Sequence, residues 1–450
     1  MISLRTKANI IIAIFIASLL VATSVYAVTR TISDSNDNLE TFIRCSNGNY
    51  YSVTGANIQT AVDCFTDGGT VWLPNSVIEI TTGITIPKKV TLTGGSGTVI
   101  KAEAAANLNY LINFPLDVSL HSVISHITLD GNKDNGNSNV TGILVKAGTP
   151  DKEIMWIEII NNRIINCSIG IELLGYSSNI WERIWHIKIL HNSFGGSGAS
   201  NNKHINATYA YSILVKDNAF EDADDIGIHL YDCRGWQING NWFDDITNFS
   251  IYMNSSLGEW EFNTIISNNV LTDAGNVYDG IYLGHGVSKV TVESNSIKGC
   301  GRDGIRIYDR YNIINGNHII SNTGNGINCT ADAKFLEITN NEIISNTDGI
   351  NSSVASTYDI ITGNMIYANS RKGLYFSGSN SVITNNNFFT NTDGVSITNT
   401  NGLIGFNSGY ETIFPTINVT TFQAGYAWFD TVTNNLNIYN GTAWVNLTFA

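Results

Sequence analysis

One phrase recurs between Asn295 and Asn407 at intervals of 21 to 24 residues: Asn295-Ser-Ile297, Asn317-His-Ile319, Asn341-Glu-Ile343, Asn364-Met-Ile366, Asn386-Asn-Phe388 and a final Asn407. A fixed period of this kind is the signature of a repeat architecture. Eight or nine residues after each of the first five asparagines comes a glycine followed by an aliphatic residue: Gly304-Ile305, Gly326-Ile327, Gly349-Ile350, Gly373-Leu374 and Gly394-Val395. Two short apolar segments per repeat, separated by polar residues, predict short strands joined by turns and leave no room for an amphipathic helix.

A repeat of this length cannot bury its own apolar side, so we expect it to stack on its neighbours as a parallel β-solenoid. Successive coils are about 4.8 Å apart, so each residue lies over its counterpart, and stacked asparagine side chains can hydrogen-bond along the column. Asparagine also tolerates the left-handed backbone conformation that turns require. The position two residues after each asparagine predicts an inward core column: Ile164, Phe194, Phe220, Phe243 and Leu271.

The opening of the repeat region has its own pattern. Residues Asn57–Phe65 show helical spacing of apolar residues, and Gly68–Pro74 follows as Gly-Gly and an apolar strand. Together with the asparagine and Gly-Ile phrases, this segment resembles the right-handed parallel β-helix proteins of the pectate lyase and polygalacturonase superfamily. The resemblance covers roughly Asn57 to Asn407 and implies an all-β fold with a short N-terminal capping helix. That superfamily contains lyases, hydrolases, epimerases, viral tail spikes and adhesins, so the resemblance does not imply one activity.

Residues 1–27 have the features of a signal peptide. Arg5 and Lys7 precede an apolar run, and Val25-Tyr26-Ala27 offers the small residues that a signal peptidase accepts. An uncleaved anchor helix is the alternative, because the run is borderline in length for spanning a bilayer. Both interpretations place the protein outside the cytoplasm, extracellular or at the cell surface, and make the cell envelope a candidate partner.

Two further segments flank the predicted β-helix of residues 57–407. Residues 28–56 are polar, and residues 408–450 leave the repeat. The second segment contains apolar stretches at 425–430, 436–439 and 442–447, the last two separated by Asn440-Gly441, which predicts short strands and a hairpin turn. We interpret this tail as a C-terminal cap or as an element through which copies of the chain form a homo-oligomer.

The composition narrows the class of partner. The formal net charge is -14 with only 14% charged residues, which argues against a nucleic-acid partner. Sequons such as Asn139 and Asn248 permit glycosylation but do not show it. Of the six cysteines, Cys45 and Cys64 flank the predicted cap and are the pair we expect to form a disulfide in an oxidising compartment.

Aromatic and ionisable residues are concentrated in the middle coils, between Trp156 and Trp260 and just beyond, where Gly195–Asn206 is predicted to leave the coil as a loop. The outward positions of the strand after each Gly-Ile phrase form two columns: Glu172, His229, Tyr252, Tyr282 and Arg306, and beside it Tyr231, Asn254, Gly284 and Tyr308. Sugars stack on aromatic faces and accept hydrogen bonds from charged and amide groups. We therefore predict a polysaccharide-binding surface at these residues: His229, Tyr231, Tyr252, Tyr282 and Tyr308. The alternative is that tyrosine and arginine simply suit an exposed strand.

Carboxylates form a second column. Asp222, Asp245 and Asp273 each fall four residues after a repeat asparagine, where later coils have serine or threonine. Carboxylates stacked about 4.8 Å apart repel one another, so a compensating group is expected. The column is a candidate Ca²⁺ site or a carboxylate pair divided into acid and base. The alternative is a solvated turn whose charges point apart.

Three phrases are similar to motifs of polygalacturonase-like enzymes: Asp224-Asp225-Ile-Gly-Ile228, Gly284-His285-Gly286 and Gly304-Ile-Arg306-Ile307. The resemblance implies that Asp224 and Asp225 supply acid and base, that His285 lies beside them, and that Arg306 binds a substrate carboxylate. The sequence departs from the pattern because Tyr308 stands where lysine is expected and the coil at Ser250 separates the paired aspartates from His285. A motif of this kind depends on its structural context.

Two classes of function remain from the sequence. The first is an exported β-helix protein that binds polysaccharide on its middle coils and acts as a hydrolase, lyase or epimerase, with no certain cofactor other than the candidate Ca²⁺. The second is a non-catalytic surface, adhesin or fibre protein in which the solenoid is a rigid spacer. Convergent carboxylates on the outward face favour the enzyme, and splayed carboxylates favour the spacer.

Overall fold

The computed structural model describes residues 42–405, 407–408, 427–430, 435–439 and 444–448, apart from residues 88, 116–120, 148–153, 177–183, 197, 257–259, 262, 273–276 and 331. The predicted signal peptide and residues 28–41 lie outside this part of the chain, as does the proposed calcium ligand Asp273. No helix in the described residues is long and apolar enough to span a membrane.

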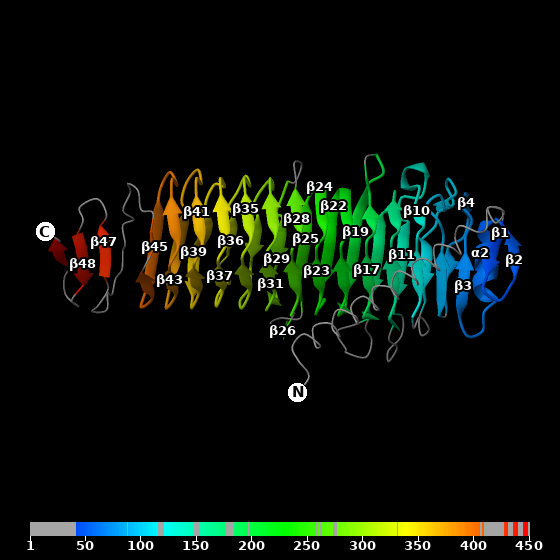
Figure 1. Ribbon diagram of the computed structural model, residues 1–450, viewed down its shortest axis with the longest axis horizontal. Coiled ribbons are helices and arrows are strands. Elements are labelled where there is room, and N and C mark those ends of the chain that lie inside the picture. The colour runs from blue at the N-terminus through cyan, green and yellow to red at the C-terminus, as the bar shows by residue number, and fades with distance from the viewer. Residues whose placement is uncertain are drawn as a thin grey trace, which may run out of the picture.

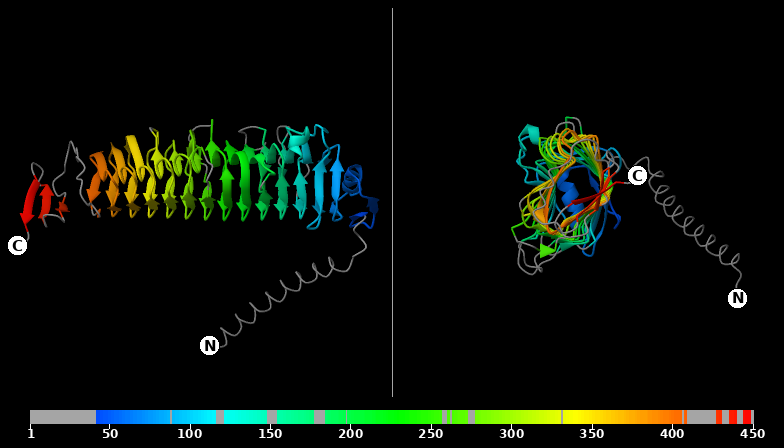
Figure 2. Two further views of the ribbon diagram at one scale, coloured as in Figure 1. Left: turned by 90° about the horizontal axis from the view of Figure 1, so that it is seen from above. Right: turned by 90° about the vertical axis from the view of Figure 1, so that its left-hand side faces the viewer.

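The chain winds into an elongated, right-handed parallel β-helix of about 13 coils, which confirms the predicted fold (Figure 1). Each regular coil contributes one strand to each of three faces. In one coil these are β31 (Thr291–Glu293), β32 (Ser296–Lys298) and β33 (Ile305–Ile307), and every strand pairs in parallel with its counterpart in the next coil. The end-on view shows the coils superposed around one axis (Figure 2).

Face 1 is a 16-stranded sheet that starts with two antiparallel strands and continues in parallel. Its strands are β1 (Phe42–Cys45), β2 (Tyr50–Ser52), β3 (Gly69–Trp72), β6 (Val90–Thr93), β9 (Val123–Ser125), β13 (Glu158–Ile160), β17 (Lys188–Leu190), β21 (Leu214–Lys216), β23 (Gln237–Asn239), β27 (Ile265–Ser267), β31, β34 (Ile313–Asn315), β37 (Glu337–Thr339), β40 (Ile360–Thr362), β43 (Val382–Thr384) and β46 (Leu403–Gly405).

Faces 2 and 3 together form a 25-stranded sheet. Face 2 contains β4 (Val77–Ile80), β7 (Val99–Ala102), β10 (Thr128–Asp130), β14 (Arg163–Ile165), β18 (Ser193–Phe194), the first half of β22 (Ala219–Tyr231), β24 (Trp242–Ile246), β28 (Val270–Thr272), β32, β35 (His318–Ile320), β38 (Glu342–Ile344), β41 (Met365–Tyr367) and β44 (Asn387–Phe389). Face 3 contains β5 (Ile84–Thr85), β8 (Tyr110–Phe114), β11 (Thr141–Lys146), β15 (Ile169–Leu174), β19 (Asn201–Thr208), the second half of β22, β25 (Phe249–Asn254), β29 (Ile281–Leu283), β33, β36 (Ile327–Cys329), β39 (Ile350–Thr357), β42 (Leu374–Ser379) and β45 (Val395–Thr400).

Small elements complete the described chain. Two short sheets lie beside the faces, one of β12 (Ile154–Met155), β16 (Ile184–Trp185) and β20 (Ala210–Tyr211), the other of β26 (Trp260–Glu261) and β30 (Val287–Ser288). A 3-10 turn η1 (Lys133–Asn135) follows β10. The tail forms three antiparallel strands, β47 (Ala427–Asp430), β48 (Asn435–Tyr439) and β49 (Trp444–Thr448), close to the expected positions, while the Asn440-Gly441 turn lies outside the described residues.

The backbone changes direction at three corners, and each corner repeatedly uses a residue with positive φ. The first corner joins faces 1 and 2, the second joins faces 2 and 3, and the third joins face 3 to the next coil of face 1. Examples are Asp217 (φ 54°) at the first, Asp222 (φ 53°) at the second and Trp156 (φ 62°) at the third. This region of φ/ψ space is unfavourable for most side chains, and asparagine and glycine adopt it most readily.

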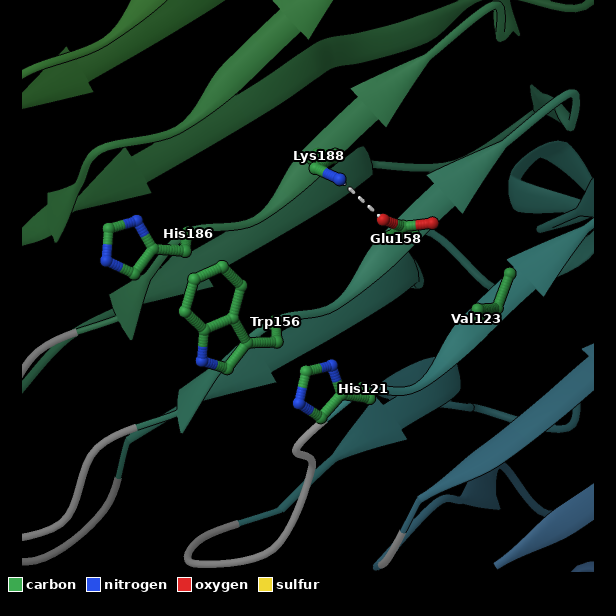
Figure 3. Close-up of a pocket in the computed structure, with 6 residues that line it drawn as sticks. All are labelled: His121, Val123, Trp156, Glu158, His186 and Lys188. Carbon is green, nitrogen blue, oxygen red and sulfur yellow. Dashed lines mark hydrogen bonds and ion pairs between the residues drawn. The ribbon is translucent and has the colours of Figure 1, made fainter. Parts of the chain in front are cut away.

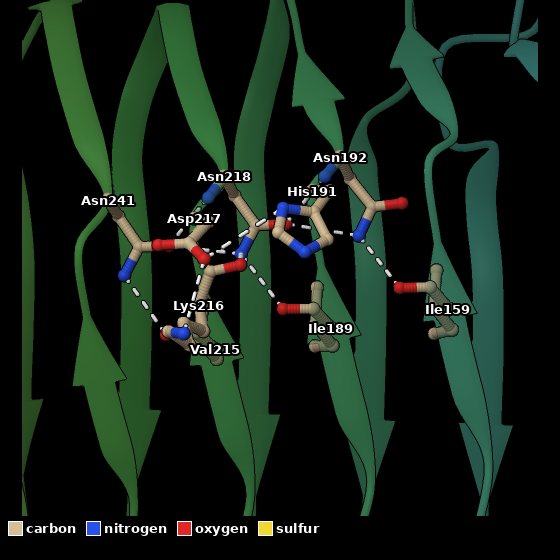
Figure 4. Close-up of polar contacts among 9 residues, drawn as sticks. All are labelled: Ile159, Ile189, His191, Asn192, Val215, Lys216, Asp217, Asn218 and Asn241. Carbon is tan, nitrogen blue, oxygen red and sulfur yellow. Dashed lines mark hydrogen bonds and ion pairs between the residues drawn. The ribbon is translucent and has the colours of Figure 1, made fainter. Parts of the chain in front are cut away.

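The recurrent asparagines form a buried ladder, as predicted, directly after the first corner (Figure 4). Asn218 Nδ2 donates to Ile189 O at 2.9 Å and to Asn241 Oδ1 at 3.0 Å, and Asn218 Oδ1 accepts from Asn192 N at 2.8 Å. The ladder asparagines from Asn162 to Asn386 do not themselves have positive φ; the residue before each of them does. The repeated asparagine is therefore explained by its hydrogen bonds to neighbouring coils and not by its tolerance of the left-handed conformation.

The predicted core column is confirmed. Ile164, Phe194, Phe220, Phe243 and Leu271 are all fully buried. Neighbouring rings stack, with centroids 4.8 Å apart for Phe194 and Phe220 and 4.7 Å for Phe220 and Phe243. Face-to-face aromatic contacts of this kind add to the free energy gained by burying the rings.

The N-terminal end of the core is covered by α2 (Gly55–Asp63), slightly earlier than the predicted range Asn57–Phe65. Thr54 caps the helix because its side chain accepts a hydrogen bond from Asn57 N, and Ile58, Ala61 and Val62 face the core. The helix lies across the end of the solenoid (Figure 2). Covering the open end removes an exposed apolar face that would otherwise invite association.

The expected Cys45–Cys64 disulfide is not formed: all six cysteines, which lie in the described residues, are free thiols. Both thiols of the pair approach the same carbonyl, with Cys64 Sγ 2.9 Å and Cys45 Sγ 3.7 Å from Ala61 O. Burial, aided by Cys64, raises the pKa of Cys45 to about 12, so this thiol is protonated at neutral pH.

The buried carboxyl group of Asp359 makes the stability of the C-terminal coils depend on pH. Its Oδ1 accepts a hydrogen bond from Leu336 N at 3.0 Å, and burial raises its pKa from 3.8 to about 6. A raised pKa means that the folded state binds the proton more tightly, so the contribution to stability is complete below pH 3.8 and is lost as the pH rises through 6. The full difference corresponds to roughly 3 kcal/mol.

Asp359→Asn is expected to remove this dependence. Asn312, at the equivalent position, already accepts a hydrogen bond from Val290 N at 2.9 Å, so asparagine can serve here. Urea unfolding of both proteins at several values between pH 4 and pH 7 should show the wild type losing up to roughly 3 kcal/mol relative to the variant as the pH rises. Parallel stability curves for the two proteins would contradict the prediction.

Candidate functional site

The outward side of face 3 carries the predicted column in its middle coils. The strand register places Glu172 beside Asn206, Asn206 beside His229, and then Tyr252, Tyr282 and Arg306 in successive coils. The prediction that Gly195–Asn206 leaves the coil is wrong in its second half, because Asn201–Thr208 is strand β19. Asn206 therefore belongs to the column, which continues beyond Arg306 as Asn328 and Asn351.

The tyrosines of the column stack on one another along the solenoid axis. The rings of Tyr252 and Tyr282 have centroids 4.7 Å apart and an interplanar angle of 2°. The ring of Tyr308, which belongs to the neighbouring column in the next coil, has its centroid 5.2 Å from that of Tyr282. The ring centroid of His285 is 4.7 Å from that of Tyr308. Because the ring faces contact each other, the rings present mainly their edges and hydroxyl groups to solvent.

His229 is held in one orientation by its neighbours. Its Nδ1 lies 2.8 Å from Asn206 Oδ1, while Asn206 Nδ2 donates to Glu172 Oε1 at 3.2 Å. The amide oxygen accepts, so Nδ1 carries the proton and Nε2 is left as the basic nitrogen. Burial, with a contribution from Lys203, lowers the pKa of His229 to about 4, so the imidazole is neutral at pH 7.

Two lysines bind the paired aspartates at the edge of this column. Lys133 Nζ donates to Asp224 Oδ2 at 2.6 Å and to Asn202 Oδ1 at 3.0 Å. Lys203 Nζ lies 3.8 Å from Asp225 Oδ2 and 3.5 Å from His229 Nδ1. The Asp224 side chain remains 53% exposed, so it can still contact a ligand.

Asp225 also joins neighbouring coils. Its Oδ1 accepts a hydrogen bond from Asn248 Nδ2 in the next coil at 2.8 Å. Aspartates one position further along the strand, directly before Gly-Ile phrases in later coils, make similar contacts: Asp279 binds the Arg302 guanidinium through both oxygens, and Asp348 binds Arg371 in the same way. These aspartates tie one coil to the next.

Arg306 is positioned by Asp303, with Arg306 Nη1 3.6 Å from Asp303 Oδ2. Its guanidinium also lies 5.6 Å from the centre of the Tyr308 ring. Burial raises the pKa of Asp303 despite the hydrogen bonds that it accepts from Asn328 and Asn325. Arg306 is therefore fixed at the C-terminal end of the aromatic column.

The structure does not gather the four residues that the polygalacturonase resemblance implied. Asp224 and Asp225 precede the strand segment that begins at Ile226, whereas His285 follows β29, at the other end of face 3 and two coils away. With about 3.3 Å per strand residue and 4.8 Å per coil, Asp225 and His285 are roughly 25 Å apart. Asp224 and Asp225 instead have Lys133, Lys203 and His229 as neighbours.

The predicted acid column lies at the second corner. Glu221 pairs with Asp244, so Asp222 and Asp245 are also adjacent. Burial, followed by the Asp245 carboxylate, raises the pKa of Asp222. Within the described residues no group of three His, Cys, Asp or Glu side chains has the arrangement of a metal site, and Asp273 lies outside them. The Ca²⁺ hypothesis gains no support from this geometry.

Sequence reasoning missed Lys133, Lys203 and Asn206. Lys133 lies 91 residues before Asp224, and only stacking of coils brings them together. Lys203 and Asn206 were assigned to a loop because the interval between repeat asparagines is irregular there. The alternation of apolar Ile205 and Ala207 with polar Asn206 and Thr208 was a strand signal that could have corrected this assignment.

The coils define the class: this chain is a right-handed parallel β-helix protein. Residues 279–427 match the protein family described as "Right handed beta helix region". No curated protein matches the chain.

Several solved structures are similar. Tailspike protein 3 of bacteriophage CBA120 has 12% identity and a TM-score of 0.50, over 94% of this chain and 76% of that one. The A-module of a mannuronan C-5 epimerase from Azotobacter vinelandii has 16% identity and a TM-score of 0.48, over 81% of this chain and 92% of that one. A periplasmic alginate epimerase has 13% identity and a TM-score of 0.46, over 76% of this chain and 77% of that one. At these identities the likeness concerns the fold alone.

Proposed function

We propose that the protein binds polysaccharide along the outward side of face 3, from Asn206 to Arg306. The observation that carries the proposal is the unbroken register of Asn206, His229, Tyr252, Tyr282 and Arg306 in successive coils. These residues offer hydroxyl, amide, imidazole and guanidinium groups in a line, which suits the hydroxyl groups of a chain that runs parallel to the axis. The same column has only asparagine in the next two coils.

The test replaces two tyrosines at once. Tyr252→Ala with Tyr282→Ala removes two stacked rings and two hydroxyl groups, so affinity for a bound polysaccharide should fall at least roughly ten-fold. Affinity gel electrophoresis against soluble neutral, uronate-containing and sulfated polysaccharides measures the change. Tyr375→Ala is the matched control, because Tyr375 stands in the same column beyond Asn351 and outside the proposed surface. Equal retardation of the wild type and the double variant in every gel would contradict the proposal.

A second candidate function is chemical modification of a uronate-containing polysaccharide. The observation that favours it is the neutral imidazole of His229, fixed by Asn206 with Nε2 free to accept a proton. Tyr252, whose ring centroid is 5.2 Å from that of His229, stays protonated because burial raises the pKa of its hydroxyl. A base and an acid are thus adjacent on the surface where the sugar chain is proposed to lie.

The reaction would begin at the carbon next to the sugar carboxylate. His229 Nε2 takes the C5 proton, the electron pair forms the C4–C5 double bond, and the C4–O bond breaks while the Tyr252 hydroxyl protonates the leaving oxygen. Lys203, next to His229, is placed to offset the negative charge that develops on the carboxylate. If the C4–O bond does not break, delivery of a proton to the opposite face of C5 would give an epimer in place of a cleaved chain.

A further inference from the structure

The third corner of the solenoid carries a row of aromatic residues apart from face 3. His121, Trp156 and His186 lie at this corner in successive coils, two residues before Val123, Glu158 and Lys188 of face 1. The ring centroids of Trp156 and His186 are 4.6 Å apart, and those of His121 and Trp156 are 5.9 Å apart. Figure 3 shows the three rings in a row beside the strands of face 1.

These three residues adopt a backbone conformation that is unfavourable for residues with large side chains. All have positive φ, 65° at His121, 62° at Trp156 and 52° at His186. Four other coils place Gly235, Asn263, Asn380 or Asn401 at the same corner position, which are residues that adopt this conformation readily. Further coils have Ser212, Lys289 or a second aromatic group, Tyr311, Phe335 and Tyr358. The free energy gained by ring stacking is of similar size to the cost of the strained backbone. Aromatic residues therefore bring no net gain in stability here, and stability alone does not explain them. Trp156 also leaves 40% of its surface in contact with solvent.

The three rings border a cavity of about 340 Å³. Its other lining residues are Val123, Glu158 and Lys188, and Lys188 Nζ binds Glu158 Oε1 at 2.7 Å. The volume is at the lower end of the range for small-molecule sites. Because the two charges neutralise each other and the ring edges offer N–H groups and basic nitrogens, the site suits an uncharged ligand rich in hydroxyl groups.

We propose that this corner cavity is a second saccharide site, which takes an uncharged sugar unit of a glycan. The proposal stands independently of ligand binding on face 3. A sugar ring placed in the cavity contacts the exposed surface of Trp156, while its hydroxyl groups meet the imidazoles of His121 and His186 and the Glu158–Lys188 ion pair. The stacked rings and the Glu158–Lys188 ion pair already hold these side chains in place before a ligand binds. This pre-organisation lowers the entropy cost of binding.

The same corner carries a second aromatic row farther along the axis. Tyr311, Phe335 and Tyr358 stack with centroids 4.9 Å and 5.1 Å apart, and all three have positive φ. Five coil steps separate His186 from Tyr311, or about 24 Å. Both rows face the same edge of a straight solenoid, so one glycan chain that runs along the axis can contact both.

The test is direct observation of Trp156 during titration with saccharides. The full chain contains nine tryptophans, so the protein is labelled with 5-fluorotryptophan and the ¹⁹F resonance missing from Trp156→Asn is assigned to Trp156. Asparagine is the matched replacement because this corner already uses it at Asn263, so the fold should be retained. The probes are neutral glucan and mannan oligosaccharides, with polyuronate oligosaccharides as the charged comparison.

A shift of the Trp156 resonance with a neutral oligosaccharide, and at least ten-fold weaker binding by Trp156→Asn, are expected. The double variant Tyr252→Ala, Tyr282→Ala should keep this shift, which separates failure of the face 3 proposal from failure of this one. An unmoved Trp156 resonance with every neutral probe would overturn the inference. So would unchanged affinity in Trp156→Asn together with a lower unfolding temperature, since the row would then be purely structural.

Discussion

Asn218→Leu is expected to lower the free energy of unfolding by about 4 kcal/mol, because it leaves buried polar groups without partners. Leucine has a similar size but can neither accept the hydrogen bond from Asn192 N nor donate to Ile189 O and Lys216 O. Each buried group left unsatisfied costs about 1–3 kcal/mol. The ladder is continuous, so the loss falls on the interface between neighbouring coils, which is where a solenoid gains its stability.

Denaturant unfolding followed by circular dichroism measures the global effect, and hydrogen exchange at the Asn192 amide reports the local one. Asp217→Asn is the matched control at the neighbouring position (Figure 4). The Asp217 side chain is 38% exposed, and its ion pairs to His191 at 3.9 Å and to Lys216 at 3.4 Å are long, so its replacement should change stability by less than about 0.5 kcal/mol. An unchanged unfolding midpoint for Asn218→Leu, with full protection of the Asn192 amide, would show that the ladder is dispensable.

His229→Gln is expected to reduce turnover of a uronate-containing polysaccharide by about 10²–10⁴-fold, the usual contribution of a general base. Glutamine can keep a hydrogen bond to Asn206 but cannot accept the C5 proton at neutral pH. The measurement is the release of unsaturated sugar, read by ultraviolet absorbance, together with proton exchange at C5 by NMR, which detects epimerisation. Cleavage and epimerisation both begin with removal of the C5 proton by His229, so one substitution should reduce both signals.

The pH dependence provides a second check on His229. Its pKa is lowered to about 4, so the basic form persists throughout the neutral range and turnover should decline only as the pH falls through about 4. His318→Gln is the control, since His318 binds Glu342 at 2.8 Å on face 2, away from the proposed surface. Full turnover by His229→Gln, or an acid limb near pH 6.5, would argue against a catalytic role for this imidazole.

The predictions for Asn218→Leu and His229→Gln are independent of each other. The ladder prediction concerns the fold, and the His229 prediction concerns chemistry on face 3. Loss of stability without loss of binding is expected for Asn218→Leu below its unfolding transition. Absence of turnover in the wild type would leave the binding proposal in place and return the protein to the non-catalytic class that the sequence also allowed.

The repeat, the core and the asparagine ladder were predictable because they are properties of one coil copied many times. Asn295, Ile297 and Gly304 recur at a constant spacing, and in a parallel solenoid equal positions lie over one another. The column from His229 to Arg306 follows from the same rule, and the register confirms it. The helix at Gly55–Asp63 was found to within two residues because its apolar spacing is local.

The composition of the site depended on contacts that the repeat does not encode. Lys133 reaches Asp224 across several coils from a turn whose length interrupts the period, and Asn206 joins the column because β19 rejoins the sheet after an irregular segment. Likewise, motif order suggested that Asp225 and His285 meet, but the register separates them. Equal spacing determines which backbone positions align, whereas the packing of long side chains from unequal turns determines which charges and bases meet.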